Sequence, residues 1–407
     1  MFTKQQRTFS KSKIVVAISF AILSSTGVAT AQEAGAIRTE SGFDIIPAMT
    51  TTLKYDNNVT RANTNKIKSW VSVLTPSVKA NLVDGADTYT LSGALTNGEY
   101  FSSDADNFTD GYVQADAQIS PSSRDNFKFS LNSRWLHEER GTGISEGNAL
   151  AQAEVVNFAD QTLDAEYRYG AVSTPGQIRI NTRLYNKDYS NFRETTQYRD
   201  YDSVLFGAGF LYQLPSAFKA VTEINSADIM FKLVDPTGSR DNRDTNYRLG
   251  AEWAFTTVSV GAIKLGYQDK NFATGEREDF NGFAWEATFV WQPLSYTAVD
   301  FAAGRRAKDV DSVNVLGDYI IETSAAVGWN HDWSEAWGTK LSLEYVDNEY
   351  NLFGRTDTSR LLTAEVNHQL LRWVKLTAFA QIEDRQSSVV AIEYDRTVVG
   401  LTAAFTL

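Results

Sequence analysis

The chain has 407 residues, no cysteine and a formal net charge of −12 at pH 7. The acidic balance argues against nucleic acid as a partner, and the lack of cysteine excludes disulfide bonds and thiol chemistry. A soluble chain of this length would normally form two or more domains. We find neither a linker nor a convincing helical period, so one all-β unit is the simpler interpretation.

The first 31 residues have the features of a secretory signal peptide. Four basic residues (Lys4, Arg7, Lys11 and Lys13) precede the apolar stretch 14–23, and the run 29–31 (Ala-Thr-Ala) fits the cleavage rule for small residues. The alternative is an N-terminal membrane anchor, but the apolar stretch is short for a spanning helix. We expect residues 1–31 to be cleaved after Sec export, residues 32–42 to form a short periplasmic segment, and residues 43–407 to form the folded unit.

Alternation of apolar and polar residues recurs from residue 43 to the end of the chain, and it predicts strands with two unlike faces. The eighteen expected strands are 43–55, 69–82, 88–101, 111–120, 127–138, 158–170, 177–190, 201–214, 218–232, 244–255, 260–272, 282–292, 296–306, 320–333, 338–350, 361–371, 374–385 and 396–407.

The connections between these strands alternate in length. Tight turns such as 83–87, 215–217, 293–295 and 372–373 follow the even-numbered strands, whereas long polar loops such as 57–68, 140–157 and 234–243 follow the odd-numbered ones. Short turns at one rim, long loops at the other and an even number of strands are typical of an outer-membrane barrel. A β-propeller or sandwich, the alternative, would have shorter strands without this asymmetry. We therefore predict a transmembrane antiparallel up-and-down β-barrel of about eighteen strands.

In each strand, the residues at every second position are apolar, and the residues between them carry the charges. We call each of these two sets of alternate positions a parity. Because every backbone group must be paired in hydrocarbon, a membrane sheet closes on itself and turns its charges inward. A Lys or Arg moved to the lipid face at mid-membrane would cost about 2–4 kcal/mol. The expected lumen-lining residues are Arg134, Asp164, Glu166, Arg168, Arg179, Arg183, Lys187, Arg248, Glu252, Lys264, Glu286, Asp300, Arg306, Glu322, Lys340, Glu344, Glu365, Lys375, Glu383 and Arg385.

Aromatic residues gather at the strand ends, where they would anchor the barrel at the membrane interfaces. Ordinary packing within the sheet is the alternative for any one of them. The expected interface aromatics are Trp70 and Trp135 near the long loops, and Tyr212, Phe218, Trp291, Tyr296, Trp333, Trp337 and Trp373 beside the short turns.

An eighteen-stranded barrel is too wide for side chains to fill, so we expect an aqueous channel unless loops fold inward. The balanced charge of its wall suits a large hydrophilic solute better than a small ion of one sign. The same charges could simply pair across strands and keep the lumen polar. The loop 140–157 is the longest and carries apolar residues, and the sequence leaves open whether it folds into the pore.

The sequence offers little for catalysis, and we expect neither an enzyme nor a metal or cofactor site. Ser133 and His137 share a face but lie four residues apart on an extended strand, over ~13 Å, which is too far for a hydrogen bond. Asp104, Asp106 and Asp110 share one loop region but lack the Gly and closing Glu of a calcium-binding loop, so a solvated loop is favoured.

Several stretches resemble a known family of barrels. They are "SGFDIIPAMTTTLKYDNNVTR" (41–61), "FRETTQYRDYD" (192–202), "YRLGAEWAF" (247–255) and "FNGFAWEATFVWQPLSYT" (280–297). These stretches and the strand pattern of the whole chain resemble the Putative β-barrel porin 2 family. The resemblance implies an outer-membrane barrel associated with exopolysaccharide or capsule loci. One departure is the final Leu407, where outer-membrane proteins usually end in an aromatic residue.

From the pattern of strands and loops and from this resemblance we predict an exit pore for exopolysaccharide or capsular polysaccharide in the bacterial outer membrane. Its partners would be outer-membrane lipids, a polysaccharide or another hydrophilic solute, and a periplasmic polysaccharide-export protein. The first alternative is a general or solute-selective diffusion porin for small hydrophilic nutrients. The second is a structural or adhesive barrel with a closed lumen.

Overall fold

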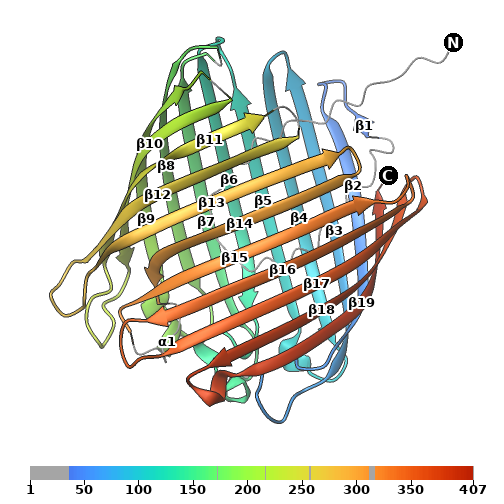
Figure 1. Ribbon diagram of the computed structural model, residues 1–407. Coiled ribbons are helices and arrows are strands. Elements are labelled where there is room, and N and C mark those ends of the chain that lie inside the picture. Colours follow the sequence, from blue (N-terminus) through green and yellow to red (C-terminus); the bar gives the residue numbers. More distant parts are fainter. Residues whose placement is uncertain (1–35, 172, 216, 256–257, 311–316, 407) are drawn as a thin grey trace.

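The computed structural model describes residues 36–171, 173–215, 217–255, 258–310 and 317–406. Within these residues, eighteen antiparallel strands form one closed sheet, so the predicted fold class is confirmed (Figure 1). The expected signal peptide, 1–31, lies outside the described residues. The segment 32–42, expected to be a simple periplasmic stretch, contains a two-residue strand, β1 (Ile37–Arg38), which pairs with the start of β2.

Each expected strand corresponds to one observed strand, with ends that shift by up to five residues. The observed strands are β2 (Asp44–Asp56), β3 (Ser69–Asp84), β4 (Asp87–Tyr100), β5 (Phe108–Ile119), β6 (Asp125–Glu138), β7 (Val156–Tyr169), β8 (Gly176–Tyr189), β9 (Tyr201–Gln213), β10 (Phe218–Phe231), β11 (Asn242–Phe255), β12 (Ser259–Phe272), β13 (Phe280–Leu294), β14 (Thr297–Asp309), β15 (Tyr319–Asp332), β16 (Trp337–Tyr350), β17 (Thr356–Leu371), β18 (Val374–Ser387) and β19 (Tyr394–Thr406).

The barrel closes where the last strand meets the first full strand. β19 pairs antiparallel with β2, from Val398 opposite Asp56 to Thr406 opposite Ala48. Every other strand pairs with its neighbour in sequence, which is the topology expected of an up-and-down barrel. Both β1 and the end of β19 therefore lie at the rim of the short turns, and the long loops gather at the other rim (Figure 1).

One expected turn is wrong in its position. The sequence places a turn at 293–295, but β13 continues through Pro293 to Leu294, and Ser295 and Tyr296 make the turn. The pairing of β13 with β14 shifts between Trp291 and Leu294. Proline has no N–H to donate to a ladder, and a bulge is one of the few places where a sheet accepts it. Proline therefore marks a bulge here rather than the end of the strand.

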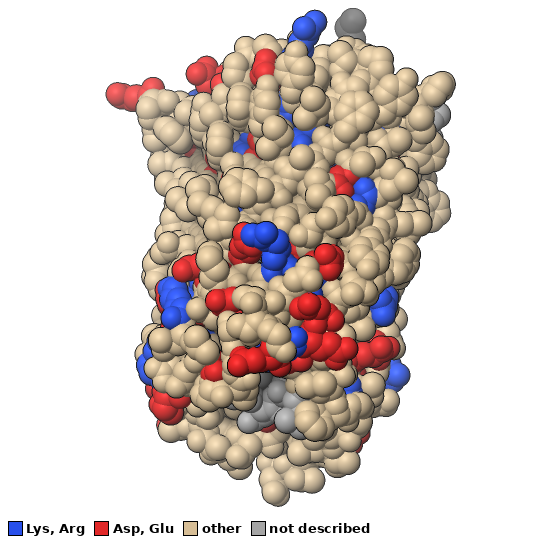
Figure 2. Space-filling model, turned by 90° about the vertical axis from the view of Figure 1, so that its left-hand side faces the viewer, with Lys and Arg blue, Asp and Glu red and all other residues tan. Residues whose placement is uncertain are grey.

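The outward face of the barrel is apolar over most of its height. Leu249 and Leu401 are each 65% exposed, although both lie within central stretches of their strands. Figure 2 shows the surface over one side of the barrel. Uncharged side chains cover most of its upper half, where charged groups lie at the top edge and at a few places below it, whereas charged side chains gather most densely in a belt toward the rim of the long loops. This division matches the apolar band and flanking polar zone of a transmembrane barrel.

The long loops contain the helical segments of the molecule. Among the described residues, the helix α1 (Arg193–Thr196) lies between β8 and β9, and single 3-10 turns occur at 104–106, 143–145, 149–151, 197–199 and 390–392. None of the helices in the described ranges is long and apolar enough to cross a membrane.

Candidate functional site: the lumen and its inward loop

The strand registers place all twenty predicted lumen residues on the face opposite the exposed apolar rows. Contacts across several strands identify this face as the concave one. Arg179 of β8 lies 3.2 Å from Glu252 of β11, although β9 and β10 run between them. Side chains on strands this far apart converge on the inside of a curved sheet and diverge on its outside.

Six of the inward residues form a continuous ion network on the wall made by β8 to β13. Glu223 lies within 4.0 Å of Arg179, Arg248 and Lys264, and Glu286 lies within the same distance of the last two. Glu252 completes the group through Arg179. The network has three cations and three carboxylates, so this part of the wall is polar but neutral.

Glycines on the neighbouring strands make room for this network. A Cβ on Gly250 would collide with the backbone of β12, and a Cβ on Gly266 would lie 2.9 Å from Arg248 Cγ. Both positions face the lumen beside the charged rows. The absence of side chains there lets the long charged side chains lie across the strands rather than project into the channel.

Ten more of the predicted residues have ionic partners on the wall or in the loops. These contacts include Arg183–Asp164 (2.7 Å), Arg134–Asp160 (2.7 Å), Arg168–Glu166 (3.2 Å), Lys187–Glu138 (3.4 Å), Arg306–Glu322 (3.4 Å), Arg385–Asp357 (2.8 Å) and Glu383–Arg61 (3.4 Å). The remaining five have no oppositely charged side chain within 4.0 Å among the described residues: Asp300, Lys340, Glu344, Glu365 and Lys375. They leave ionic groups accessible on the wall from β14 to β18.

The long loops narrow the channel at their rim. Residues 139–155, which we name the inward loop, connect β6 to β7. The buried Arg140 holds the base of this loop through two bonds to Asp106, of 2.8 and 2.6 Å. Gly141 has φ +91°, and a Cβ there would collide with the carbonyl of Thr60 in the loop 57–68. The two loops therefore pack tightly against each other.

The first residue of the inward loop also contacts another loop and another part of the wall. Glu139 pairs with Arg61 of the loop 57–68 and lies 3.8 Å from Arg396 of β19. Burial alone would raise the pKa of Glu139, but the guanidinium groups of Arg61 and Arg396 outweigh this effect and hold that pKa well below its usual value of 4.5. The Glu139 carboxylate is therefore ionised at any physiological pH.

A second contact fixes the tip of the inward loop. Glu146 lies 2.7 Å from Arg385 of β18 and 2.9 Å from Arg355, which precedes β17. Both arginines also bind Asp357. Between β6 and β18 lie β2 to β5 and β19, so the inward loop crosses the mouth as a chord.

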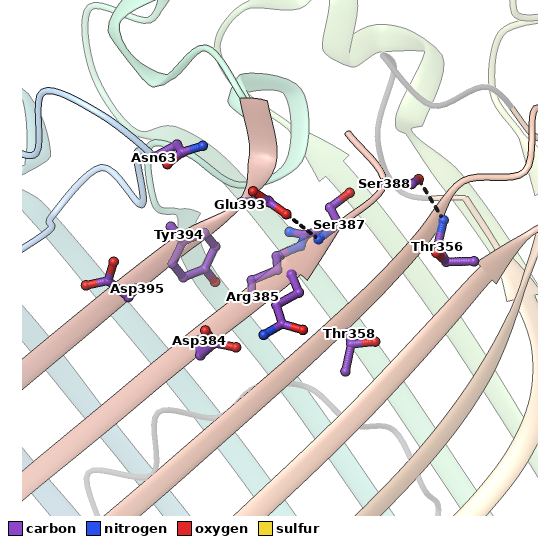
Figure 3. Close-up of a pocket in the computed structure, with 11 residues that line it drawn as sticks. Asn63, Thr356, Thr358, Asp384, Arg385, Ser387, Ser388, Glu393, Tyr394 and Asp395 are labelled. Carbon is purple, nitrogen blue, oxygen red and sulfur yellow. Dashed lines mark hydrogen bonds between the residues drawn. The ribbon is translucent and has the colours of Figure 1, made fainter. Parts of the chain in front are cut away.

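A polar recess of about 620 Å³ opens beside these contacts. Figure 3 shows Asn63 facing β17 to β19 across the recess, with hydrogen bonds from Thr356 to Ser388 and between Ser387 and Glu393 on its floor. Tyr394 and Arg385 line it from the inner face of the wall, whereas Asp384 and Asp395 have the opposite parity. The recess therefore belongs to the rim rather than to the central channel.

The residues weighed for catalysis or metal binding have structural partners. Asp106 binds Arg140 and Ser103, and Asp110 lies 2.9 Å from His137, whose ring stacks on Phe108. His331 and His368 lie against tryptophans at the rim of the short turns. In the part of the chain that the structure describes, no three His, Asp or Glu residues are grouped as metal ligands.

Eight of the nine expected interface aromatics are between 45% and 64% exposed at the two ends of the outer face: Trp70, Trp135, Tyr212, Trp291, Tyr296, Trp333, Trp337 and Trp373. Phe218 is the exception, because it packs against Trp253 with ring centroids 5.9 Å apart. Their role as lipid anchors stays a prediction.

Sequence reasoning missed several residues of the site. Glu223, the centre of the ion network, shares the inward parity of Lys219 and Val221, so alternation could have found it. Glu139, Glu146 and Arg355 lie in loops, where alternation gives no signal. The partners that bind them across the mouth are more than 200 residues away in sequence, whereas Glu139 with Arg61 and Arg355 with Asp357 are closer pairs.

No curated protein matches the sequence. Solved structures of similar shape include three from Pseudomonas aeruginosa. OpdK with vanillate has a TM-score of 0.49 at 10% identity, over 89% of this chain and 99% of that one. OpdO has a TM-score of 0.47 at 15% identity, and the match covers 89% of this chain and 97% of that one. OccK2 (OpdF) in complex with glucuronate has a TM-score of 0.48 at 10% identity, and the match covers 92% of this chain and 100% of that one.

A family model described as Putative beta-barrel porin 2 matches residues 38–406, which is almost the entire described chain. Its match spans all eighteen barrel strands, the ion network and the inward loop. The resemblance expected from the sequence is confirmed: this chain is an outer-membrane β-barrel channel that belongs to the Putative beta-barrel porin 2 family.

Proposed function

We propose that this protein is a selective diffusion porin for small hydrophilic solutes. The observation that carries the proposal is the inward loop, which crosses the mouth and is bound to β18 and β19 by Glu139 and Glu146. A chord of folded chain across the mouth limits the size of what passes. The ion network on the wall below it has equal numbers of cations and carboxylates. This part of the wall therefore offers hydrogen bonds to polar solutes without repelling either sign of charge.

Export of a polysaccharide, the function expected from the sequence, has less support. The matching family model is described as a porin. The structures reported above name neither a polymer nor a periplasmic export partner. A polymer exit would also need the inward loop to leave its ion pairs. We therefore favour the alternative of a solute porin.

Release of the inward loop tests this proposal. We expect the double substitution Glu139→Gln and Glu146→Gln to weaken the ion pairs that hold the loop and to raise the single-channel conductance in planar bilayers. Glu349→Gln is the matched control, because Glu349 lies on the outer face of β16 and should leave conductance unchanged. A double variant with the conductance of the wild type would contradict the role of the loop as the constriction.

A further inference from the structure

The barrel wall is interrupted between β13 and β14 at the rim of the long loops. β13 pairs with β12 as far as Phe280, and β14 pairs with β15 as far as Asp309. The two strands pair with each other only up to Trp285 opposite Arg305. We name the unpaired ends, residues 280–284 of β13 and 306–309 of β14, the seam.

Side chains replace the missing ladder at the seam. Gln268 of β12 accepts a hydrogen bond from the Ala307 N–H at 2.7 Å and donates one to the Ala307 carbonyl at 2.9 Å. Arg305 donates to the carbonyl of Phe283 at 2.9 Å. In a membrane wall backbone polar groups need partners. Gln268 supplies them for Ala307 from β12, and the Arg305 side chain supplies one for Phe283 and is a direct bond between β14 and β13.

The end of β14 overlaps the inner face of β12 and β13. Ala307 is buried against Phe272 and Phe280, which are inward residues of those two strands, and Tyr319 of β15 joins the same cluster. The Phe280 ring folds back over Gly282, where a Cβ would lie 2.8 Å from the ring. Two layers of wall therefore meet here through apolar packing and a few polar contacts, namely the Gln268 bonds to Ala307 and the ion pair of Lys270 with Asp309 at 2.9 Å, rather than through a ladder of backbone hydrogen bonds.

A cation stands on the outer side of the seam. Arg305 has the outward parity of Phe301 and Ala303. Among the described residues it has no carboxylate within 4.0 Å, and it donates a hydrogen bond to the Phe283 carbonyl. Next to it, Phe283 is 53% exposed, and one layer further along the strands lie the polar Asp269 and Asn281. Arg305 thus lies where the exposed apolar residues of the outer face give way to polar ones toward the rim of the long loops.

A shorter interruption between β5 and β6 differs in these respects. Their ladder ends at Gly111 opposite Trp135. The gap beyond it is joined by the pair His137–Asp110, and Val59 and Ile67 of the loop 57–68 belong to the cluster that covers Phe108. That interruption is therefore closed by packed loops, whereas the seam at β13–β14 has its apolar cluster directly behind the outer face.

We propose that the seam is a lateral port, through which an anionic amphiphile enters the barrel from the outer leaflet. The Arg305 guanidinium would hold the anionic head group, and the apolar cluster would receive the tail as the end of β14 moves away from β12 and β13. This route is separate from the axial path of hydrophilic solutes, and the proposal does not depend on conductance.

Photolabelling of the protein in vesicles tests this port. The probe is a twelve-carbon alkyl phosphate with a terminal diazirine, placed in the lipid phase, and mass spectrometry locates the labelled residues. Since the chain has no cysteine, the pair Gln268→Cys and Ala307→Cys can be joined by a short thiol-specific cross-linker that is cleaved by reduction. The matched control joins Ala287→Cys to Ala303→Cys, which lie opposite each other in the intact part of the same ladder.

We expect label on Phe272 and Phe280 in the uncross-linked protein, at least a tenfold loss after the Gln268–Ala307 positions are joined, and recovery on reduction. The Ala287–Ala303 link should leave the labelling unchanged. Arg305→Ala should weaken labelling by the phosphate probe but not by the corresponding alcohol. Label confined to outward residues such as Phe283, or equal labelling in the joined and reduced protein, would overturn the proposal.

Discussion

At the scale of single residues, most of the charged side chains on the lumen wall form ion pairs. Glu223 is 8% exposed and has three cationic neighbours, whereas Glu252 has one cationic partner among the described residues, Arg179, and is more open to the lumen. Alternation along the strands predicts which residues face inward. It cannot predict their partners, because a partner depends on side-chain reach across the curved sheet. Glu223 was missed although its inward parity was predictable, whereas its place at the centre of the network was not.

Removal of the Glu223 charge should therefore have two effects. We expect Glu223→Gln to destabilise the barrel by about 1–3 kcal/mol, since buried charges lose their partner, and to shift the channel toward anions. Reversal potentials in a salt gradient and denaturant unfolding in vesicles measure the two effects. Glu252→Gln serves as the comparison and should change stability by less than ~1 kcal/mol. Equal effects of the two substitutions would show that the network does not act as we describe.

The pKa of Glu139 predicts how the inward loop responds to acid. Its folded-state pKa is lowered below the usual 4.5 by Arg61 and Arg396, so its contribution to stability is present above that value and is lost only as the pH falls below it. Hydrogen-exchange protection in the inward loop should therefore be constant from pH 7 to pH 5. A loss of protection within that range would mean that another group controls the loop.

At the scale of elements, the strands were predictable because the bilayer imposes one rule on all of them. Each strand has to show apolar side chains to lipid and polar ones to water, so β2 to β19 appear in the sequence as eighteen alternating stretches. The sequence left open whether the inward loop folds into the pore, and the reason is the opposite one. Its fold depends on Arg355, Arg385 and Arg396, which come more than 200 residues later, and no local pattern encodes such contacts.

The division between the two faces can be tested on adjacent residues of β16. Leu343 points outward and is 46% exposed, whereas its neighbour Ser342 points into the lumen. We expect Leu343→Arg to cost about 2–4 kcal/mol, as a cation on the lipid face at mid-membrane does, and Ser342→Arg to cost much less. Unfolding in urea with vesicles would measure both. Similar costs for the two substitutions would contradict the assignment of the faces.

At the scale of the whole molecule, the barrel combines a wide scaffold with a narrowed entrance. Eighteen strands enclose more space than side chains fill, and the loops at one rim reduce it. The sequence established the scaffold and its family. The choice between polymer exit and solute porin depended on where the loops lie, because the two functions require the same strands and differ in the entrance.

Permeation through the purified protein in liposomes tests the proposed function most directly. With solutes of increasing size, we predict rapid swelling in monosaccharides and disaccharides, and no entry of dextran. Release of the inward loop by Glu139→Gln and Glu146→Gln should raise the size limit. Free passage of dextran through the wild-type protein, or no passage of any sugar, would contradict a porin whose entrance is narrowed by the inward loop.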